Sequence, residues 1–327
     1  MATTAKTTTA TETVRVTPQN FTRAETDLYF DRFVKDGALG KFLHFRELAP
    51  VDDQKVVRMN RDTLYSNAVF DLDAGPVTIT LPDSRERFMS LQILNEDQYT
   101  FDVFYKGSVT LTRKDLATRY ATAIVRTLID PSDPGDAAKV HTLQDAIKID
   151  QPGGPGTLQI PAWDQASQDK VRKALLLLAE NLSDISHACG KKGEVDPVAF
   201  LIVSAAGWGG NPPTAASYIN CVPDNNDGKT PYTLTVENVP VDGFWSLTVY
   251  NAEGFLQKND RNAYSVNNLT AKKDPDGAVT VQFGGDPANA SNFLPIVQGW
   301  NYTVRLYRPR KEILDGTWKF PEAKPVS

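Results

Sequence analysis

Histidine and cysteine are scarce in this sequence, with three His and two Cys among 327 residues. Zinc and iron sites are usually built from several of these ligands at short spacing. The sequence contains no His-x-His or His-Glu-x-x-His motif, and the two cysteines, Cys189 and Cys221, lie far apart in it. We therefore expect free thiols, no metal site and no other cofactor.

Long apolar runs and an excess of basic residues are also missing. No stretch approaches the roughly 20 apolar residues that a membrane-spanning helix needs, and 35 Lys and Arg against 40 Asp and Glu give a net charge of −5. These features argue against a membrane segment and against a nucleic-acid surface, which requires a basic face. Residues 1–19 are rich in Thr and Ala without the apolar centre of a signal peptide, so we expect a disordered leader and a cytoplasmic protein. Secretion from an untrimmed precursor stays an alternative.

Two common functional motifs are absent. A serine hydrolase of the α/β type needs Gly-x-Ser-x-Gly at a turn between a strand and a helix, and the sequence has none. The glycine-rich "GWGGNPP" at 207–213 follows an apolar segment instead of opening a helix, so it does not fit dinucleotide binding. We interpret this stretch as a conformationally demanding loop between domains, with the floor of a pocket as the alternative.

Apolar and polar side chains alternate over 63–129, as they do in half-buried strands. The stretch "VTITLP" places Val77, Ile79 and Leu81 on one side, and "RFMSLQIL" repeats the pattern. Turn residues separate these stretches, so we predict an antiparallel meander. With a helical segment over 21–45, the strands form a predicted N-terminal β-rich domain over 20–155.

A helical connector is predicted over 156–212. Its strongest helix covers 167–188, with a buried stripe that includes Leu175 and Leu178. Residues 213–327 return to short strands separated by Asp-Gly turns, which is typical of a sandwich or jelly roll. The predicted fold class is mainly β with α (α+β): an N-terminal antiparallel β domain, connecting helices and a C-terminal jelly-roll-like β-sandwich.

Two long blocks resemble a known pair of domains. "MNRDTLYSNAVFDLDAGPVTITLPD", with "RTLIDPSDP" after it, resembles the domain of unknown function DUF1254. "DGFWSLTVYNAEGFLQKNDRNAYSVNN", with "WNYTVRLYRPRKEILDGTWKFP", resembles its usual partner, DUF1214. The resemblance implies a β-rich first domain and a jelly-roll-like second domain, and it assigns no catalytic residue. Some relatives are richer in histidine around the position of His44, where this chain has a single His.

Polar side chains gather at the start of the predicted strand at 63. Alternation places one set on one face: Thr63, Tyr65, Asn67, Val69 and Asp71. The other set is predicted to be core: Leu64, Ser66, Ala68, Phe70 and Leu72. The first set must lie in water or in a polar cavity, because burying each unpaired group costs on the order of 1–3 kcal/mol. Two interpretations stay open, a network that fixes the strand and the wall of a pocket.

The pocket interpretation assigns roles to particular residues. Asp62, Tyr65 and Asp97 are the predicted catalytic acid/base residues, and Arg61 or Arg261 would stabilise charge. The predicted substrate-binding residues are Asn60, Arg61, Asn67, Tyr99, Trp208, Asn211, Arg261 and Tyr264.

Three functions follow from these features. The first is a cofactor-independent enzyme, a hydrolase first and a lyase or isomerase next, acting on a small polar or oxygenated molecule in a cleft between the two β domains. The second is a carbohydrate- or small-ligand-binding module that uses Trp245 and Trp300, although both fit a core position better. The third is a structural or interaction role. The expected partner is a small-molecule ligand, with no nucleic acid and no membrane, and a homo-oligomer is compatible with each function.

Overall fold

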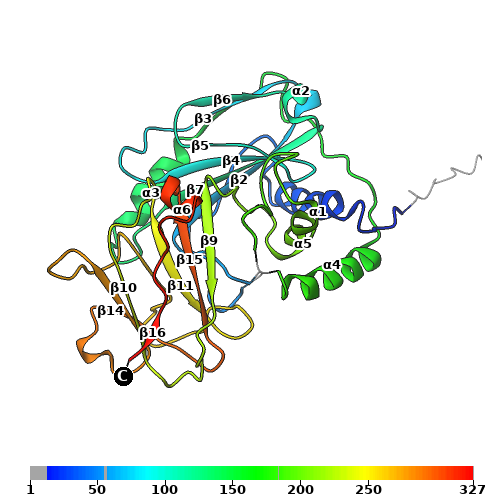
Figure 1. The fold of residues 1–327 in the computed structure, drawn as a ribbon. Coiled ribbons are helices and arrows are strands. Elements are labelled where there is room, and N and C mark those ends of the chain that lie inside the picture. Colours follow the sequence, from blue (N-terminus) through cyan, green and yellow to red (C-terminus); the bar gives the residue numbers. More distant parts are fainter. Residues whose placement is uncertain (1–12, 55–56, 183, 327) are drawn as a thin grey trace, which may run out of the picture.

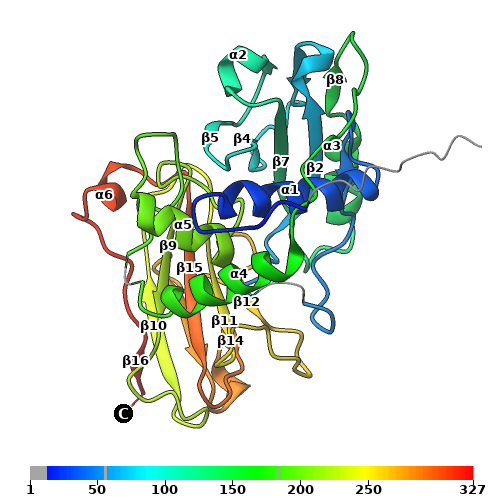
Figure 2. The same cartoon turned by 90° about the vertical axis from the view of Figure 1, so that its right-hand side faces the viewer.

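The computed structural model describes residues 13–54, 57–182 and 184–326. Its sheets pair mainly antiparallel, and helices cover part of their surface, which confirms the predicted mainly β, α+β class. Figures 1 and 2 show a first domain stacked on a sandwich formed by the last third of the chain, with three helices, α1, α4 and α5, grouped beside them.

The first domain contains two sheets that pack face to face. The first sheet has the order β1-β2-β7-β4-β5, with β1 (Leu43–His44), β2 (Thr63–Asp71), β7 (Tyr120–Leu128), β4 (Met89–Asn95) and β5 (Thr100–Phe104). The second sheet has the order β6-β3-β8, with β6 (Ser108–Leu111), β3 (Val77–Thr80) and β8 (Lys148–Asp150). Their shared core includes Phe70 and Val125 from the first sheet and Ile79 from the second.

The predicted meander is wrong in its pairing. β2 pairs with β7, which also pairs with β4, while β3 joins the second sheet between β6 and β8. An alternating pattern defines the two faces of each strand. It does not say which strands are neighbours, because that depends on the turns and on long-range packing.

The predicted core face of β2 is confirmed. Ala68, Phe70 and Leu72 belong to the core of the first domain, and Leu64 packs with Ile129. The opposite face turns toward the helices, because Val69 on this face packs with Phe30 of α1. Tyr65 lies on the same face and is half-buried.

Helices flank the sheets and connect the domains. They are α1 (Phe21–Lys35), α2 (Arg113–Leu116), α3 (Asp136–Asp145), α4 (Gln165–Ala179), α5 (Pro197–Ala206) and α6 (Lys311–Leu314), with the 3₁₀ turns η1 (Leu72–Ala74) and η2 (Pro287–Asn289). α4 is shorter than predicted, and its apolar stripe is narrower. Leu175 packs against the group that includes Phe21 and Ile202, whereas Leu178 is 55% exposed. The periodic leucines therefore predicted a helix. They did not predict which of these leucines other elements would bury.

The N-terminal end of the described chain is held to the fold. Residues 1–12 of the predicted leader lie outside the described residues. Val14 donates its backbone N–H to the carbonyl of Ala162 at 2.8 Å, and Val16 is buried. None of the helices in the described ranges combines the length and apolar character needed to cross a membrane.

The second domain is a sandwich of two sheets. The third sheet has the order β12-β11-β15-β9, with β12 (Ser265–Asn267), β11 (Trp245–Tyr250), β15 (Asn301–Tyr307) and β9 (Ala216–Cys221). The fourth has the order β14-β13-β10-β16, with β14 (Asn292–Leu294), β13 (Val279–Phe283), β10 (Tyr232–Val236) and β16 (Lys324–Pro325). Trp245 and Trp300 lie in the core between them, 6% and 0% exposed. Neither tryptophan therefore presents a ring to a carbohydrate.

An aromatic cluster joins the two domains. The rings of Phe244 and Tyr307 from the second domain stack with centroids 4.2 Å apart. Phe88, which precedes β4, contacts Phe244 edge-on at 5.0 Å, and Leu128 packs in the same cluster. This contact sets the outer face of the third sheet against the first sheet.

Candidate site at the domain junction

Two buried arginines occupy the polar sheet faces that meet at the domain junction. Arg126 on β7 is 6% exposed, and Arg305 on β15 is 4% exposed. The strand register places Tyr65 beside Arg126, and it places Ser246 and Tyr218 beside Arg305. Each guanidinium thus lies among polar neighbours of its own sheet.

Neutral oxygens hold the Arg126 guanidinium. It donates to Gln92 Oε1 at 2.7 Å, to the carbonyl of Gly209 at 2.9 Å and to Asn211 Oδ1 at 3.4 Å. Gln92 in turn donates to the carbonyl of Gly210 at 2.7 Å. Gly209 has φ +75°, and a Cβ on it would lie 3.2 Å from Ile124 on β7, so this glycine lets the loop approach the sheet. A Cβ on Gly210 would lie 2.6 Å from the sulfur of Cys189. These contacts fix the loop against β7 and β4 of the first domain.

Tyrosine hydroxyls from both domains surround this arginine. Nδ2 of Asn60 lies 3.3 Å from the hydroxyl of Tyr65 and 3.0 Å from that of Tyr307. Nδ2 of Asn211 donates to the hydroxyl of Tyr218 at 2.9 Å, and the Arg126 guanidinium lies 5.5 Å from the centre of the Tyr65 ring. We call this group the tyrosine–arginine cluster; its members are Asn60, Tyr65, Arg126, Asn211, Tyr218 and Tyr307.

The phenols of this cluster differ in acidity. Burial by itself raises the pKa of Tyr65, but the positive charge of Arg126 and the hydrogen bonds from Asn60, Arg126 and Thr63 outweigh it, so the pKa lies below the usual 10.0. Burial raises the pKa of Tyr218 and raises that of Tyr307 well above 10.0. Tyr65 is therefore the phenol in the cluster that is most ready to lose a proton.

The second arginine lies in a sealed group of polar residues. Arg305 donates to the hydroxyl of Tyr250 at 2.7 Å, to the carbonyl of Arg58 at 2.8 Å and to the hydroxyl of Thr248 at 3.1 Å. Asn267 donates to Asp62 Oδ1 at 3.1 Å. We call this group the Asp62–Arg305 cluster; its members are Asp62, Ser246, Thr248, Tyr250, Asn267 and Arg305.

Asp62 supplies negative charge to this second cluster. It is 1% exposed, and burial raises its pKa, although Arg305, Ser246 and Asn267 act in the opposite direction. Burial by itself lowers the pKa of Arg305, but Tyr250, Tyr307 and the charge of Asp62 outweigh it, so the pKa is raised. The carboxylate and the guanidinium therefore stabilise each other across the junction.

The structure brings together only part of the predicted site. Asn60, Tyr65 and Asn211 meet in the tyrosine–arginine cluster. Asp62 lies in the Asp62–Arg305 cluster, and the guanidinium of Arg61 lies 5.3 Å from the Tyr264 ring.

The other predicted residues contact different parts of the molecule. Asp97 accepts from Arg23 on α1 at 2.5 Å, and Arg261 is exposed, 5.5 Å from the Phe293 ring. Tyr99 stacks on Phe200 at 4.7 Å, and Trp208 stacks on Tyr29 at 4.2 Å. Asn67 is 7% exposed on the Tyr65 face of β2. The geometry therefore gives Asp97 and Arg261 no place beside Tyr65.

Sequence reasoning missed Arg126, Arg305, Tyr218 and Tyr307. A usable signal existed for the arginines, since each is the single charge in an apolar strand, "YATAIVRTL" and "NYTVRLY". A charge inside a buried strand requires polar partners from elsewhere in the fold. The tyrosines carried no comparable signal, because aromatic residues are common in strands.

A further buried carboxylate belongs to α1 itself. Asp27 is fully buried and accepts from Trp163 Nε1 at 2.8 Å. Burial raises its pKa to about 7, and the charge of Glu96 adds to the shift. Glu96 pairs with Arg23 at 3.3 Å. In the described part of the chain, no three His, Cys, Asp or Glu side chains are grouped to hold a metal ion.

Comparisons with known proteins agree with this two-domain architecture. The family model for a protein of unknown function (DUF1254) matches residues 39–115, and the one for a protein of unknown function (DUF1214) matches residues 217–311. The chain therefore belongs to the proteins that carry these two domains in this order, as its sequence predicted. No curated protein matches it.

Two solved structures share the fold. The VPA0106 protein from Vibrio parahaemolyticus has a TM-score of 0.68 at 20% identity, over 94% of this chain and 98% of that one. A putative uncharacterized protein from Burkholderia cenocepacia has a TM-score of 0.52 at 15% identity, over 94% and 86%. At these identities the similarity shows the fold alone.

Proposed function

We propose that this protein is an enzyme that binds a small anionic or oxygenated molecule at the tyrosine–arginine cluster and acts on it by acid/base chemistry. The observation that carries the proposal is the environment of Arg126. Its hydrogen bonds go to neutral oxygens, and no carboxylate forms an ion pair with it among the described residues. A buried charge without a counter-charge is costly, so an anion beside Arg126 would be strongly stabilised.

Tyr65 is the base in this proposal. Its pKa is lowered by Arg126, and its side chain is half-buried rather than sealed. A base whose pKa is moved toward neutral pH is suited to proton transfer. Arg126 would stabilise the negative charge that develops on the substrate, and Asn60 and Asn211 would orient the neighbouring phenols.

Hydrolysis, with Tyr65 activating water, is the first reaction class to test, and elimination or isomerisation with the same base comes next. Asp62 is fully buried and Asp97 is paired with Arg23, so the proposal gives neither of them contact with substrate. Binding of an anion without turnover is the alternative function.

The experiment is a proton-release screen of small esters, lactones, amides and hydroxy acids with the wild type. Tyr65→Phe should lower turnover of any substrate found by about 10²- to 10⁴-fold, the usual range for a general base. The matched control is Tyr29→Phe, a half-buried tyrosine on α1, which should leave turnover unchanged. Both variants should melt within a few degrees of the wild type.

Two results would contradict the proposal. One is a substrate that Tyr65→Phe turns over as fast as the wild type. The other is a screen without turnover in which small carboxylates also fail to raise the melting temperature. Saturable carboxylate binding without turnover would replace catalysis by the binding alternative.

A further inference from the structure

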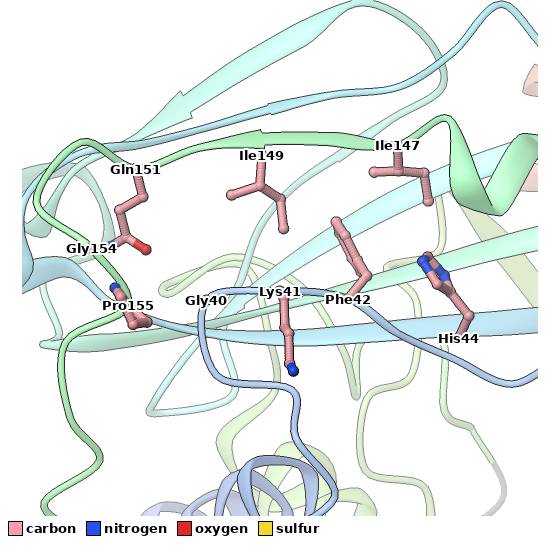
Figure 3. Close-up of a pocket in the computed structure, with 9 residues that line it drawn as sticks. All are labelled: Gly40, Lys41, Phe42, His44, Ile147, Ile149, Gln151, Gly154 and Pro155. Carbon is pink, nitrogen blue, oxygen red and sulfur yellow. The ribbon is translucent and has the colours of Figure 1, made fainter.

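A pocket of about 480 Å³ lies on the side of the first domain, between the edges of its two sheets. β1 is the edge strand of the first sheet, and β8 is an edge strand of the second. Figure 3 shows Phe42 and His44 projecting from the β1 segment toward Ile147 and Ile149 on the β8 segment, with Gln151 at the far end. The side chain of Lys41 points away from these residues, at the rim.

Hydrogen bonds behind the pocket determine the tautomer of His44. Nδ1 of His44 lies 2.8 Å from the hydroxyl oxygen of Ser66. The same oxygen accepts from Nε2 of Gln144 at 3.2 Å, and that nitrogen is identified as the donor because it also serves the carbonyls of Phe45 and Tyr65. The Ser66 hydroxyl is fully buried, and among the described residues Nδ1 of His44 is the one acceptor within reach of its proton. We therefore assign that proton to the Ser66–His44 bond and the proton of the neutral ring to Nε2.

Nε2 of His44 is left as a hydrogen-bond donor. No residue in the described ranges accepts a hydrogen bond from it. Burial, and then the nearby charge of Arg46, lower the pKa of His44, so the ring is neutral at pH 7. Ser66 is fully buried and cannot attack a molecule in the pocket. The His44–Ser66 pair therefore fits binding rather than nucleophilic catalysis.

We propose that this pocket binds a small carboxylate with an apolar body, whose oxygen accepts the hydrogen bond from Nε2 of His44. Phe42, Ile147 and Ile149 form the apolar walls, and the exposed ammonium of Lys41 adds positive charge at the rim. The combination of a few fixed polar groups and apolar walls is typical of small-molecule sites. This site is separate from the tyrosine–arginine cluster, because Ser66 and Tyr65 are consecutive on β2 and face opposite sides of the first sheet.

The test is nitrogen-15 NMR of the histidine rings, which gives one set of signals for each of three histidines. In the free protein His44 should show the Nε2-protonated tautomer. Octanoate and benzoate should shift its ring signals in a saturable manner at pH 7.5, whereas octylamine should not. His44→Asn places an amide near the former Nδ1, so it keeps contact with Ser66 but lacks the donor in the pocket. The affinity measured by calorimetry should fall at least tenfold.

Two further variants make the test independent of the folding of His44→Asn. Ile149→Phe should fill the pocket and lower the affinity by a similar factor, with the His44–Ser66 bond intact. His187→Asn changes an exposed histidine and should leave binding unchanged. The proposal is overturned if neither carboxylate shifts His44 at millimolar concentration, if octylamine binds as well as octanoate, or if Ile149→Phe binds like the wild type.

Discussion

The two buried arginines of the domain junction have similar positions and opposite environments. Each lies on a central strand of a sheet whose other face is apolar core, and each is at least 94% buried. Arg305 has the buried carboxylate Asp62 as its counter-charge. Arg126 has only neutral oxygens and phenols. The difference separates an arginine that feels the charge of a buried carboxylate from one that donates its hydrogen bonds, within the described part of the chain, to neutral oxygens.

The exposure of the tyrosines also differs between the two clusters. Tyr250, which accepts from Arg305, is fully buried, whereas Tyr65 and Tyr218 beside Arg126 are half-buried. The members of the Asp62–Arg305 cluster are all buried, whereas two phenols of the tyrosine–arginine cluster are partly exposed. Perturbed acidity at a partly exposed position is found more often at functional sites than at structural ones.

The largest expected effect is the difference between two matched variants, Arg305→Met and Arg126→Met. Arg305→Met leaves Asp62 buried without its counter-charge, so we expect the free energy of unfolding to fall by about 3–4 kcal/mol. Arg126→Met leaves only neutral acceptors unpaired and should cost about 1–2 kcal/mol. Chemical denaturation of both variants at pH 7 measures the difference. Equal losses would remove the distinction between the two arginines.

A smaller loss of stability is expected for Asn60→Ala. This variant tests the hydrogen bonds that join the two domains beside Arg126. Asn60 accepts from the backbone of Asp62 at 2.7 Å and contacts the hydroxyl of Tyr307 in the other domain. Loss of these bonds should cost about 1–2 kcal/mol, and it should also raise the pKa of Tyr65. Denaturation and a tyrosine titration report the two changes separately. A variant as stable as the wild type would mean that Asn60 does not link the domains.

A pH-dependent effect is expected for Asp27, whose pKa is raised mainly by burial. Folded Asp27 keeps its proton up to about pH 7, whereas in the unfolded chain it loses it near pH 3.8. Between these values unfolding releases a proton, so stability decreases as pH rises and then levels off above pH 7. In Asp27→Asn no carboxyl group ionises at this position, so this decrease in stability is absent. The stability of this variant relative to the wild type should rise by about 3 kcal/mol between pH 4 and pH 7, as thermal melts can measure. A difference independent of pH would contradict the shifted acidity of Asp27.

Much of the fold could be predicted from the sequence, because local patterns determine it. The strands at 63–71 and 120–128 and the helix at 197–206 follow from alternation, apolar runs and Asp196 as a helix cap. Their pairing could not be predicted, since β2 pairs with β7 across about fifty residues of chain that contain four other strands. Long-range pairing leaves no local signal.

Within the candidate site, the sequence predicted only those residues that lie close together along the chain. Asn60 and Tyr65 belong to one polar stretch and were found together. Arg126 and Tyr307 come from other strands, so their approach to Tyr65 depends on the sheet order and on the docking of the domains. Asp97 was expected nearby because it also follows a strand, but its turn faces α1, where Arg23 binds it.

The most direct test of the contrast between the arginines is a spectrophotometric titration of the tyrosines at 295 nm. The wild type should show one phenol that ionises below the usual pKa of about 10, and Tyr65→Phe should lack this step. Arg126→Met should move the step to higher pH, and Tyr218→Phe should retain it. If every tyrosine of the wild type ionises at or above pH 10, or if the early step survives in Tyr65→Phe, Arg126 does not activate Tyr65 and the account is contradicted.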